Sequence, residues 1–349
     1  MNKIKVGNCE IGGGKIAIQS MISKKIQRTD EILEEITAMK MAGLDIIRLA
    51  VPSMADVADF GKITQKSAVP VVADIHFDYK IAIAAVENGA SKIRINPGNI
   101  GSEENVKKVV DACKMHGVPI RVGANLGSLE KSAEEKYGRT AKAIAVSAFE
   151  SVKILEKHNF HDICVSLKAS DVQRTVEANR IFRSEHPQYP LHIGVTETGT
   201  REMGEVKSAI GIGSLLLDGI GETLRVSLTS DPINEVKFAR KILRGCGLEN
   251  YVEVISCPTC GRCNYDVERV STQVSEMVKD FKTENGFKIA VMGCVVNGVG
   301  EGKEADIGIA CGNGKFVVFK GGETLRTIAE NEMDIFYNLV KEELKKGEL

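Results

Sequence analysis

Three cysteines lie close together in the segment SCPTCGRCNYD. Cys257 and Cys260 form a C-x-x-C pair, and Cys263 forms a second pair that overlaps the first. Cys294 follows in GCVVNGVGE, which ends at Glu301. Four thiolates with this spacing can hold an iron–sulfur cluster or a structural zinc ion, and the spacing alone does not choose between the two.

The expected cellular compartment decides how the other cysteines are interpreted. The N-terminal segment MNKIKVGNCEIGGGK lacks the apolar core of a signal peptide, and no run of about 18 apolar residues could span a bilayer. We therefore expect a cytoplasmic protein whose cysteines are thiols or metal ligands. Cys311 is a modest rival ligand, and the cysteines expected to be small buried apolar residues are Cys9, Cys113, Cys164 and Cys246.

A second set of chemical groups lies in short apolar segments that each contain one arginine. These segments are Ile47-Arg48-Leu49, Ile93-Arg94-Ile95, Ile120-Arg121-Val122 and Leu224-Arg225-Val226. Side chains alternate along a strand, so the aliphatic neighbours take one face and the arginine the other. If the neighbours face helices, each guanidinium points into a barrel interior, where an unpaired charge is costly and calls for an anion.

Further polar side chains share these inner faces, since the same alternation predicts interior positions for Asp74, His76, Asn96, Asn125, Ser166, Lys168 and Ser227. Glu197 lies late in the seventh predicted strand. The four arginines and Lys168 thus face two clear late-strand carboxylates, Asp74 and Glu197. Structural pairing would explain any single arginine equally well, but not all of them. The surplus of cations predicts a phosphorylated substrate, and a diphosphate would occupy three or four of them.

The elements that must position these groups repeat from residue 16 to about 247. The expected strands are IAIQSM, DIIRLAVP, PVVADIHF, KIRINPGN, PIRVGAN, ICVSLKAS, LHIGVTETG and TLRVSLTSDP, each followed by an amphipathic helical pattern. Helix starts are expected at Ser53, Ser102, Asp171 and Asp231. Eight such units predict a (β/α)8 TIM-type barrel over residues 1–247, with its site at the carboxyl ends of the strands. An open doubly wound sheet is the rival.

Residues 248–349 have a different pattern. They contain the clustered cysteines, a helical pattern near 265–283, the strands KIAVMGC and FVVF, a glycine-rich segment and a terminal helix. We expect a smaller α+β domain. Its loop glycines, Gly293, Gly298, Gly300 and Gly302, would let the backbone approach a cluster closely.

Several segments resemble the (E)-4-hydroxy-3-methylbut-2-enyl diphosphate synthase family in its two-domain bacterial form. They are VADIHFDYKIA, KIRINPGNIG, GSLEKSAEEKYG, VSLKASDV, VKSAIGIG, DGIGETLRVSL, SCPTCGR and GCVVNGVGE. The resemblance implies reductive ring opening and dehydration of 2-C-methyl-D-erythritol 2,4-cyclodiphosphate, with two electrons passing through a [4Fe–4S] cluster. It also implies the ligand set Cys257, Cys260, Cys294 and Glu301, and a homodimer in which the cluster domain of one chain covers the barrel of the other. Flavodoxin or ferredoxin would supply the electrons.

On this basis we expect the diphosphate to be bound by Arg48, Arg94, Arg121 and Lys168, assisted by Asn96, Asn125 and Ser227. Glu197 or Asp74 would supply a proton. Asn297 would touch the substrate from the cluster side.

Two positions depart from the family pattern. Cys263 stands where a polar non-ligand is expected, and Val299 where proline is expected. A carboxylate is harder and more exchangeable than a thiolate, so it can leave an iron free to bind a substrate oxygen. This favours Glu301 over Cys263 as the fourth ligand.

Other classes of protein remain open at this point. One is a zinc-stabilised barrel enzyme that acts on a phosphorylated metabolite without redox chemistry. Another is a simple electron carrier, for which a cationic barrel has no purpose. The formal net charge of -1 speaks against a nucleic acid or a membrane surface as a partner.

Overall fold

The computed structural model describes residues 1–263, 265–281, 283–294, 298, 300, 302–312 and 314–347. The chain divides into two compact units, Met1–Cys246 and Gly247–Leu349. Each unit has a hydrophobic core of its own.

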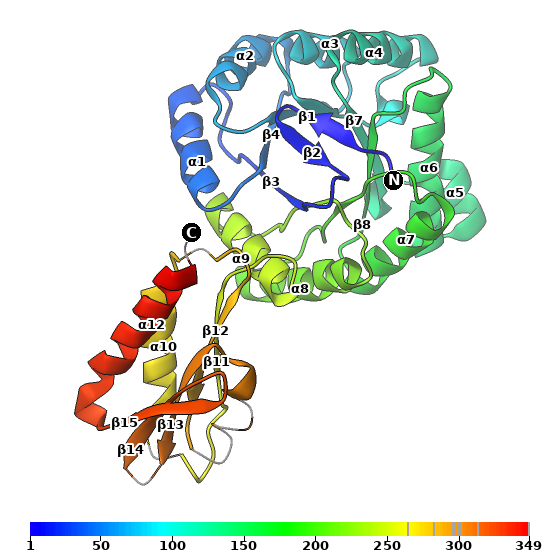
Figure 1. Cartoon of the computed structure of the whole chain (residues 1–349). Helices are drawn as coiled ribbons and strands as arrows, with labels where there is room; N and C mark the ends of the chain where they lie inside the picture. The colour runs from blue at the N-terminus through cyan, green and yellow to red at the C-terminus, as the bar shows by residue number, and fades with distance from the viewer. Residues whose placement is uncertain are drawn as a thin grey trace. The chain divides into compact units, whose positions relative to one another are not determined.

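Within residues 1–246, which are all described, eight parallel strands form one sheet in the order β8-β7-β6-β5-β4-β3-β10-β9. An isolated parallel bridge between Val165 and Leu191 links β8 to the segment that enters β9 and so completes the circle. The barrel prediction is confirmed, and the open sheet is excluded (Figure 1). The strands are β3 (Ala17–Met21), β4 (Ile46–Ala50), β5 (Val71–Asp74), β6 (Lys92–Arg94), β7 (Ile120–Asn125), β8 (Ile163–Lys168), β9 (His192–Ile193) and β10 (Thr223–Leu224).

Helices surround the barrel (Figure 1). They are α1 (Thr29–Met41), α2 (Val57–Lys66), α3 (Tyr79–Glu87), α4 (Glu103–His116), α5 (Lys131–Tyr137), α6 (Ala141–Glu156), α7 (Val172–Glu185), α8 (Arg201–Leu217) and α9 (Pro232–Gly245), with 3-10 turns η1 (Met54–Asp56), η2 (Pro97–Asn99) and η3 (Leu126–Ser128). Ser102, Asp171 and Asp231 each accept a backbone N–H from the first turn of a helix, as their positions predict. Ser53 precedes η1.

A β-hairpin that the sequence reasoning missed closes one end of the barrel. Its strands are β1 (Ile4–Val6) and β2 (Cys9–Ile11). Their buried side chains pack against Ala17, Ile46 and Val72, which lie near the amino ends of β3, β4 and β5. The opposite, carboxyl end of the strands is the end at which barrel sites occur.

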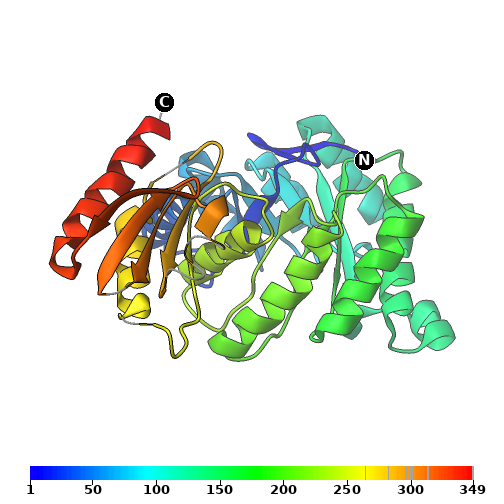
Figure 2. The ribbon, with the colours of Figure 1, turned by 60° about the horizontal axis from the view of Figure 1, so that its bottom comes forward.

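The second unit is a five-stranded sheet with helices α10 (Val267–Val278) and α12 (Met333–Gly347) and 3-10 turns η4 (Gly302–Glu304) and η5 (Glu330–Glu332). Its strands are β11 (Val252–Ser256), β12 (Phe287–Met292), β13 (Ile307–Gly312), β14 (Lys315–Lys320) and β15 (Glu323–Ile328). The first three are parallel and the last three antiparallel. Both helices contribute to the core on one face of the sheet, beside which they lie in Figure 2.

Two loop glycines have a purpose other than the expected approach to a cluster. A Cβ on Gly298 would come within 2.3 Å of the Ala310 Cβ, and one on Gly302 within 2.5 Å of the Phe319 ring. These glycines are therefore required by packing inside the unit, which accounts for them without a cluster. In the described part of the chain, no helix is long and apolar enough to cross a membrane.

Candidate active site

The arginines of β4 and β6 meet at one carboxylate. Asp74, the last residue of β5, is 2% exposed and accepts a hydrogen bond from Arg48 Nη2 at 2.6 Å. Arg94 Nη1 lies 3.4 Å from Oδ1 of Asp74, and His76 Nε2 lies 3.3 Å from Oδ2 of the same carboxylate. The aliphatic neighbours of both arginines belong to the core shared with the helices, as strand alternation predicts. The three strands thus bring these groups together inside the barrel.

The environment of Asp74 decides its charge. Burial would raise the pKa of Asp74, but the charges of Arg48 and Arg94 and the hydrogen bond from Arg48 outweigh it. The pKa of this carboxyl therefore lies below its ordinary value, and Asp74 is ionised at neutral pH.

Arg121 and Lys168 extend the cationic region onto β7 and β8. Arg121 is 2% exposed, and its Nε and Nη1 find no hydrogen-bond partner in the fully described first unit. Burial and the neighbouring charge of Arg48 lower the pKa of Arg121, although a guanidinium stays protonated in proteins. Burial, with the charges of Arg121 and Arg225, also lowers the pKa of Lys168 well below its ordinary value. An anion bound here would relieve both costs.

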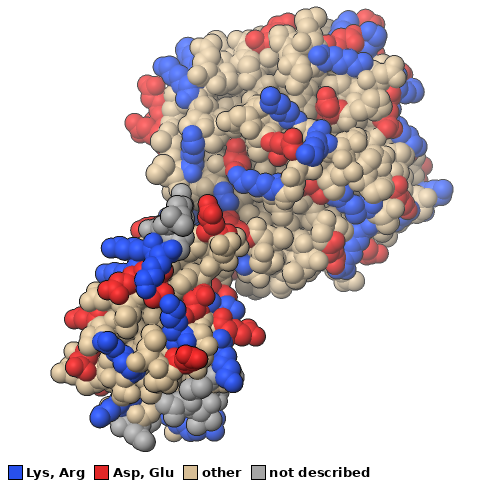
Figure 3. All heavy atoms as spheres, in the orientation of Figure 1, with Lys and Arg blue, Asp and Glu red and all other residues tan. Residues whose placement is uncertain are grey.

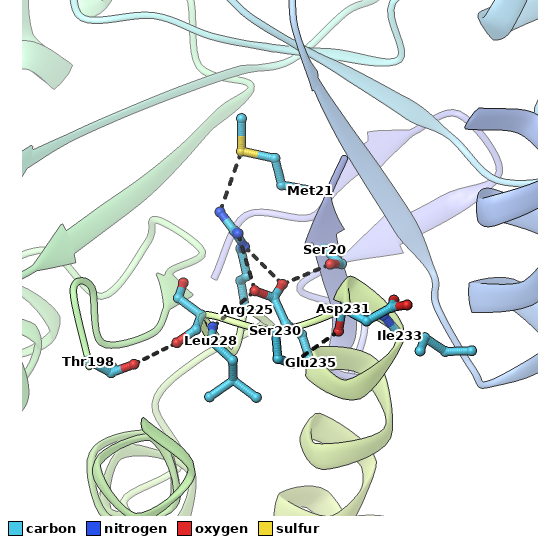
Figure 4. Close-up of polar contacts among 10 residues, drawn as sticks. Ser20, Met21, Thr198, Arg225, Leu228, Ser230, Asp231, Ile233 and Glu235 are labelled. Carbon is cyan, nitrogen blue, oxygen red and sulfur yellow. Dashed lines mark hydrogen bonds and ion pairs between the residues drawn. The ribbon is translucent and has the colours of Figure 1, made fainter. Parts of the chain in front are cut away.

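Arg225 has a carboxylate partner that the sequence reasoning missed. Glu235, in the first turn of α9, is 4% exposed and lies 3.4 Å from Arg225 Nε (Figure 4). Its oxygens also accept hydrogen bonds from Ser20 Oγ at 2.9 Å and from the Leu228 backbone N–H at 3.0 Å. Arg225 is therefore compensated within the protein, and the expectation that late-strand carboxylates alone face the cations is wrong. A buried glutamate on a helix gives no strand-alternation signal.

Three further predicted residues lie at or after the carboxyl ends of β6, β7 and β10. Asn125 is the last residue of β7, and Asn96 follows β6 and caps η2 by accepting the Gly98 N–H. Ser227 follows β10, and its carbonyl accepts a hydrogen bond from Thr198 Oγ1 at 2.6 Å.

Glu197, after β9, is exposed and has a φ of 53°. This left-handed conformation is uncommon for a residue with a side chain, and such strain gathers at functional sites.

The face of the molecule drawn in Figure 3 does not repeat the interior imbalance of charge. On the face drawn in Figure 3, basic and acidic side chains are interspersed over both units. Inside the barrel, Arg121 and Lys168 face other cations. The interior thus holds positive charge that neighbouring cations do not compensate, as a buried site for a polyanion requires.

The clustered cysteines lie at the carboxyl ends of two adjacent parallel strands. Cys257 follows β11, and Gly293 and Cys294 follow β12, which pairs with β11 through Ser256 and Val291. The Gly293 N–H donates to Cys257 Sγ at 3.1 Å. A Cβ on Gly293 would come within 2.8 Å of Cys263 Sγ and 3.1 Å of Cys257 Sγ. Two sulfurs thus converge on a backbone that only glycine allows.

The loop between these cysteines is held by its own contacts. Thr259 has a φ of 61°, and the Cys263 N–H donates to the Cys260 carbonyl at 2.9 Å. Cys263 Sγ also donates to the Tyr265 carbonyl at 3.1 Å. Among the described residues no three His, Cys, Asp or Glu side chains are grouped as a metal would need. Asn297, Val299 and Glu301 lie outside the described residues.

Comparison with protein families identifies both parts of the chain. Residues 1–240 match the GcpE TIM-barrel domain, and residues 253–344 match the GcpE protein C-terminal domain. The chain belongs to the GcpE family. The match of the first domain agrees with the barrel seen here, and the second GcpE domain contains the cysteines that follow β11 and β12.

Curated GcpE-type relatives are similar over nearly the whole chain. A protein of Caldanaerobacter subterraneus subsp. tengcongensis is 52% identical over 95% of this chain and 93% of its own length. One of Fusobacterium nucleatum subsp. nucleatum is 49% identical over 98% of this chain and 95% of its own length. Both are named 4-hydroxy-3-methylbut-2-en-1-yl diphosphate synthase (flavodoxin).

Solved structures with the same architecture are distant in sequence. The dihydropteroate synthase of Yersinia pestis superposes with a TM-score of 0.52 at 11% identity, over 70% of this chain and 97% of its own. That of Stenotrophomonas maltophilia gives 0.51 at 12% identity, over 69% and 98%. At such identities the likeness concerns the barrel fold alone.

Proposed function

We propose that this chain catalyses the reaction for which its GcpE relatives are named, forming (E)-4-hydroxy-3-methylbut-2-enyl diphosphate from 2-C-methyl-D-erythritol 2,4-cyclodiphosphate. Identity of 52% over 95% of the chain supports this reaction class. The structural observation that carries the proposal is the buried surplus of cations, above all the unpaired N–H groups of Arg121 in the first unit. A diphosphate offers the oxygens that these donors lack.

In this proposal the two parts of the chain have separate tasks. Residues 1–247 bind the substrate, and residues 248–349 hold the redox group. The substrate-binding residues are Arg48, Arg94, Arg121, Lys168, Asn96, Asn125 and Ser227. They come from β4, β6, β7 and β8 and from the segments that follow β6 and β10, so a diphosphate between them would be held from several strands at once.

Of the two carboxylates expected to supply a proton, Glu197 is the better donor. The lowered pKa of Asp74 keeps that group ionised and occupied by Arg48 and Arg94. Asp74 then orients the two arginines. Glu197 is exposed and held in a left-handed conformation at the end of β9, where it can reach a substrate at the mouth.

We further propose that a [4Fe–4S] cluster is bound by Cys257, Cys260, Cys294 and Glu301, with Asn297 beside the substrate. The fit rests on the thiol-rich donor set and on the Gly293 N–H, which donates to Cys257 Sγ at 3.1 Å. Such a cluster supplies electrons one at a time and offers a Lewis-acidic iron. The polar contact of Cys263 with the Tyr265 carbonyl supports a role outside the ligand set.

Substitution of single cysteines tests this assignment. Cys263→Ser protein is expected to retain iron and acid-labile sulfide at the level of the unchanged chain. Cys257→Ser protein, the matched control in the same loop, is expected to lose most of both. Loss of the cluster from the Cys263→Ser protein would overturn the choice of Glu301 as the fourth ligand.

The electron donor proposed is flavodoxin, the donor in the relatives' printed names, with ferredoxin as the alternative. We also propose a homodimer in which the cluster domain of one chain covers the barrel of the other. Its support is that the cationic mouth and the cysteines belong to different compact units, yet both must reach one substrate.

Turnover under strict anaerobiosis tests the function directly. Reconstituted protein, reduced by dithionite through a viologen mediator, is given the cyclic diphosphate, and the linear hydroxymethylbutenyl diphosphate is sought by mass. Its formation is expected. No product from protein with a full iron–sulfur complement would refute the reaction. Purified protein that is colourless and contains zinc but no sulfide would instead identify a zinc-stabilised enzyme without redox chemistry.

A further inference from the structure

Three buried polar residues in the barrel have no part in the site described above. They are Gln19 of β3, Lys92 of β6 and His192 of β9, which are 1%, 0% and 0% exposed. Lys92 lies two residues before Arg94 on the same strand, so both side chains face the barrel interior. Lys92 is the one nearer to the end that the β1–β2 hairpin closes. We call Gln19, Lys92 and His192 the inner polar layer.

The polar atoms of the inner polar layer are not satisfied by the protein. Within the fully described residues 1–246, the Lys92 Nζ, both amide atoms of Gln19 and the His192 Nε2 have no hydrogen-bond partner. The other ring nitrogen of His192 lies 3.4 Å from Thr223 Oγ1. Unsatisfied groups at such depth cost free energy, so three residues of this kind inside one barrel call for an occupant.

The charge around Lys92 indicates what that occupant is. The groups that act on it are Cys164 on β8, Arg121 on β7, Cys9 on β2 and Arg48 on β4. Burial raises the pKa of both thiols, so they are uncharged at neutral pH. Lys92 therefore faces two cations and two neutral thiols, with no carboxylate among these facing groups.

Burial lowers the pKa of Lys92 to about 8, which still leaves most of the ammonium protonated at pH 7. The buried carboxylate Asp74 is already engaged by Arg48 and Arg94. A lysine kept only for packing would be replaced at no loss by an apolar side chain of similar length.

We propose that the inner polar layer is an internal oxyanion-binding position, in which Lys92, Gln19 and His192 bind phosphate oxygens beneath the cationic mouth. The oxygens belong either to the diphosphate bound at the mouth or to a separate inorganic phosphate. This inference rests on the proposed function only where the oxygens are those of the diphosphate bound at the mouth.

The balance of donors and acceptors favours an anion over water. Besides the histidine nitrogen, the unpartnered interior atoms comprise five N–H donors, from Gln19, Arg48, Lys92 and Arg121, against one acceptor, Gln19 Oε1. Water accepts and donates equally, so it would satisfy some of the donors but leave the charge of Lys92 uncompensated. Phosphate oxygens accept only and carry the opposite charge.

Binding of inorganic pyrophosphate to the full chain, with its metal complement, tests the proposal by calorimetry at pH 7. Lys92→Met is compared with the exposed Lys107→Met of α4 and with Arg121→Met at the mouth. Lys92→Met is expected to weaken binding by about tenfold or more, and Lys107→Met to leave it unchanged.

A thermal melt separates this role from a structural one. Without ligand, Lys92→Met removes an uncompensated buried charge, so its Tm is expected to equal or exceed that of the unchanged chain by a few °C. The rise in Tm on adding pyrophosphate is expected to shrink. A lower ligand-free Tm with unaltered pyrophosphate affinity would make Lys92 a structural residue and overturn the proposal.

The outcomes also separate this inference from the proposed function. Weaker pyrophosphate binding in Arg121→Met, with unchanged binding in Lys92→Met and no further phosphate taken up by the saturated unchanged chain, refutes the inner position and leaves the mouth as proposed. Unchanged pyrophosphate binding in both variants, again with no further phosphate taken up, refutes both the inner position and the mouth. If pyrophosphate-saturated protein takes up one further equivalent of inorganic phosphate, and Lys92→Met abolishes only that uptake, the inner anion is a separate phosphate. That result supports the inner position as well.

The pH dependence gives a second readout. An oxyanion stabilises protonated Lys92, so affinity is present below the pKa of the free protein and declines as pH rises through about 8. Arg121 and Arg48 stay protonated over this range. Burial raises the pKa of the Cys9 and Cys164 thiols above its ordinary value, and burial lowers the pKa of His192 well below its ordinary value, so that imidazole stays neutral. The ratio of wild-type to Lys92→Met affinity is therefore expected to fall between pH 7 and 9. A constant ratio would contradict the proposal.

Discussion

Asp74 controls the geometry of the cationic mouth because three basic side chains depend on it. It is 2% exposed and lies within 3.4 Å of Arg48, Arg94 and His76. The charges of the two buried arginines are compensated only while this carboxylate is ionised. Its charge therefore links substrate binding to the stability of the barrel.

Replacement of Asp74 by asparagine is expected to lower the free energy of unfolding by about 3 kcal/mol at pH 7, because it leaves two arginines without their counter-charge. Since the folded pKa of Asp74 is lowered, its contribution is complete above the unfolded pKa of about 3.9 and is lost as pH falls through the folded value. Denaturant titrations of both proteins from pH 7 to pH 3 measure the difference. The gap is expected to stay constant to about pH 5 and then to narrow. A gap that widens on acidification would contradict this account.

Glu197 combines an exposed carboxylate with a φ of 53°. Glutamate at this backbone conformation costs about 1 kcal/mol that glycine avoids. We expect Glu197→Gly to be as stable as the unchanged chain or up to about 1 kcal/mol more stable, while kcat falls by about 100-fold or more. Glu197→Gln is the control, with the same loss of kcat and no gain in stability. Full activity in either variant would exclude Glu197 as the proton donor.

At this scale the sequence predicted the cations well and their partners poorly. Alternation along strands was enough to place Arg48, Arg94 and Arg121 inside the barrel, because their aliphatic neighbours must face the helices. Glu235 was missed, since its burial depends on where α9 packs and not on any local pattern. Lys92 was missed for a related reason. A lysine at the first position of a predicted strand suggests the exposed end of that strand.

At the scale of elements, one aromatic ring decides which residues the second unit can accept where its strands pack together. The Phe319 side chain of β14 covers Gly308 of β13 and Gly302 of η4, where a Cβ would come within 2.2 and 2.5 Å of the ring. Glycine at these two positions lets β13 and β14 pair while the ring stays buried. From sequence, these glycines could not be told apart from loop glycines that serve a cluster.

Substitution of Gly308 by alanine is expected to destabilise the second unit by about 2 kcal/mol, because the added methyl also comes within 2.9 Å of the Ala290 Cβ. The free energy of unfolding of residues 247–347 can be followed by hydrogen exchange with mass spectrometry. Gly245→Ala serves as the control, because a Cβ on Gly245, at the end of α9, would meet nothing within 4 Å. Equal exchange in the Gly308→Ala protein and the unchanged chain would show that the ring can move aside.

The barrel as a whole was predictable because the same strand–helix unit occurs eight times, and repetition compensates for uncertain element boundaries. The β1–β2 hairpin was not predictable in this way. Its strands have three residues each, and they are stabilised by packing on the amino ends of barrel strands that come later in the chain. The strands β11, β13 and β15 were also missed, because pairing with a neighbour decides them more than their own composition.

For the whole molecule, the division of the cations and cysteines between two units allows a test of the proposed dimer. Arg121 lies in the unit that ends at Cys246, and Cys257 in the unit that follows. If each active site combines the barrel of one chain with the cluster domain of the other, a dimer of one Arg121→Met chain and one Cys257→Ser chain contains one intact site. Its other site carries both substitutions.

Each variant alone is therefore expected to be inactive, and an equimolar mixture, refolded or co-expressed and then reconstituted, should recover about a quarter of wild-type activity, since half of the dimers are mixed. A mixture of the two variants kept below the concentration of dimer formation provides the control. If both tasks were completed within one chain, no pairing of these variants would create an intact site, and the mixture would stay inactive. Recovery of activity, measured as linear diphosphate formed under anaerobic conditions, thus separates a site shared between chains from a site within one.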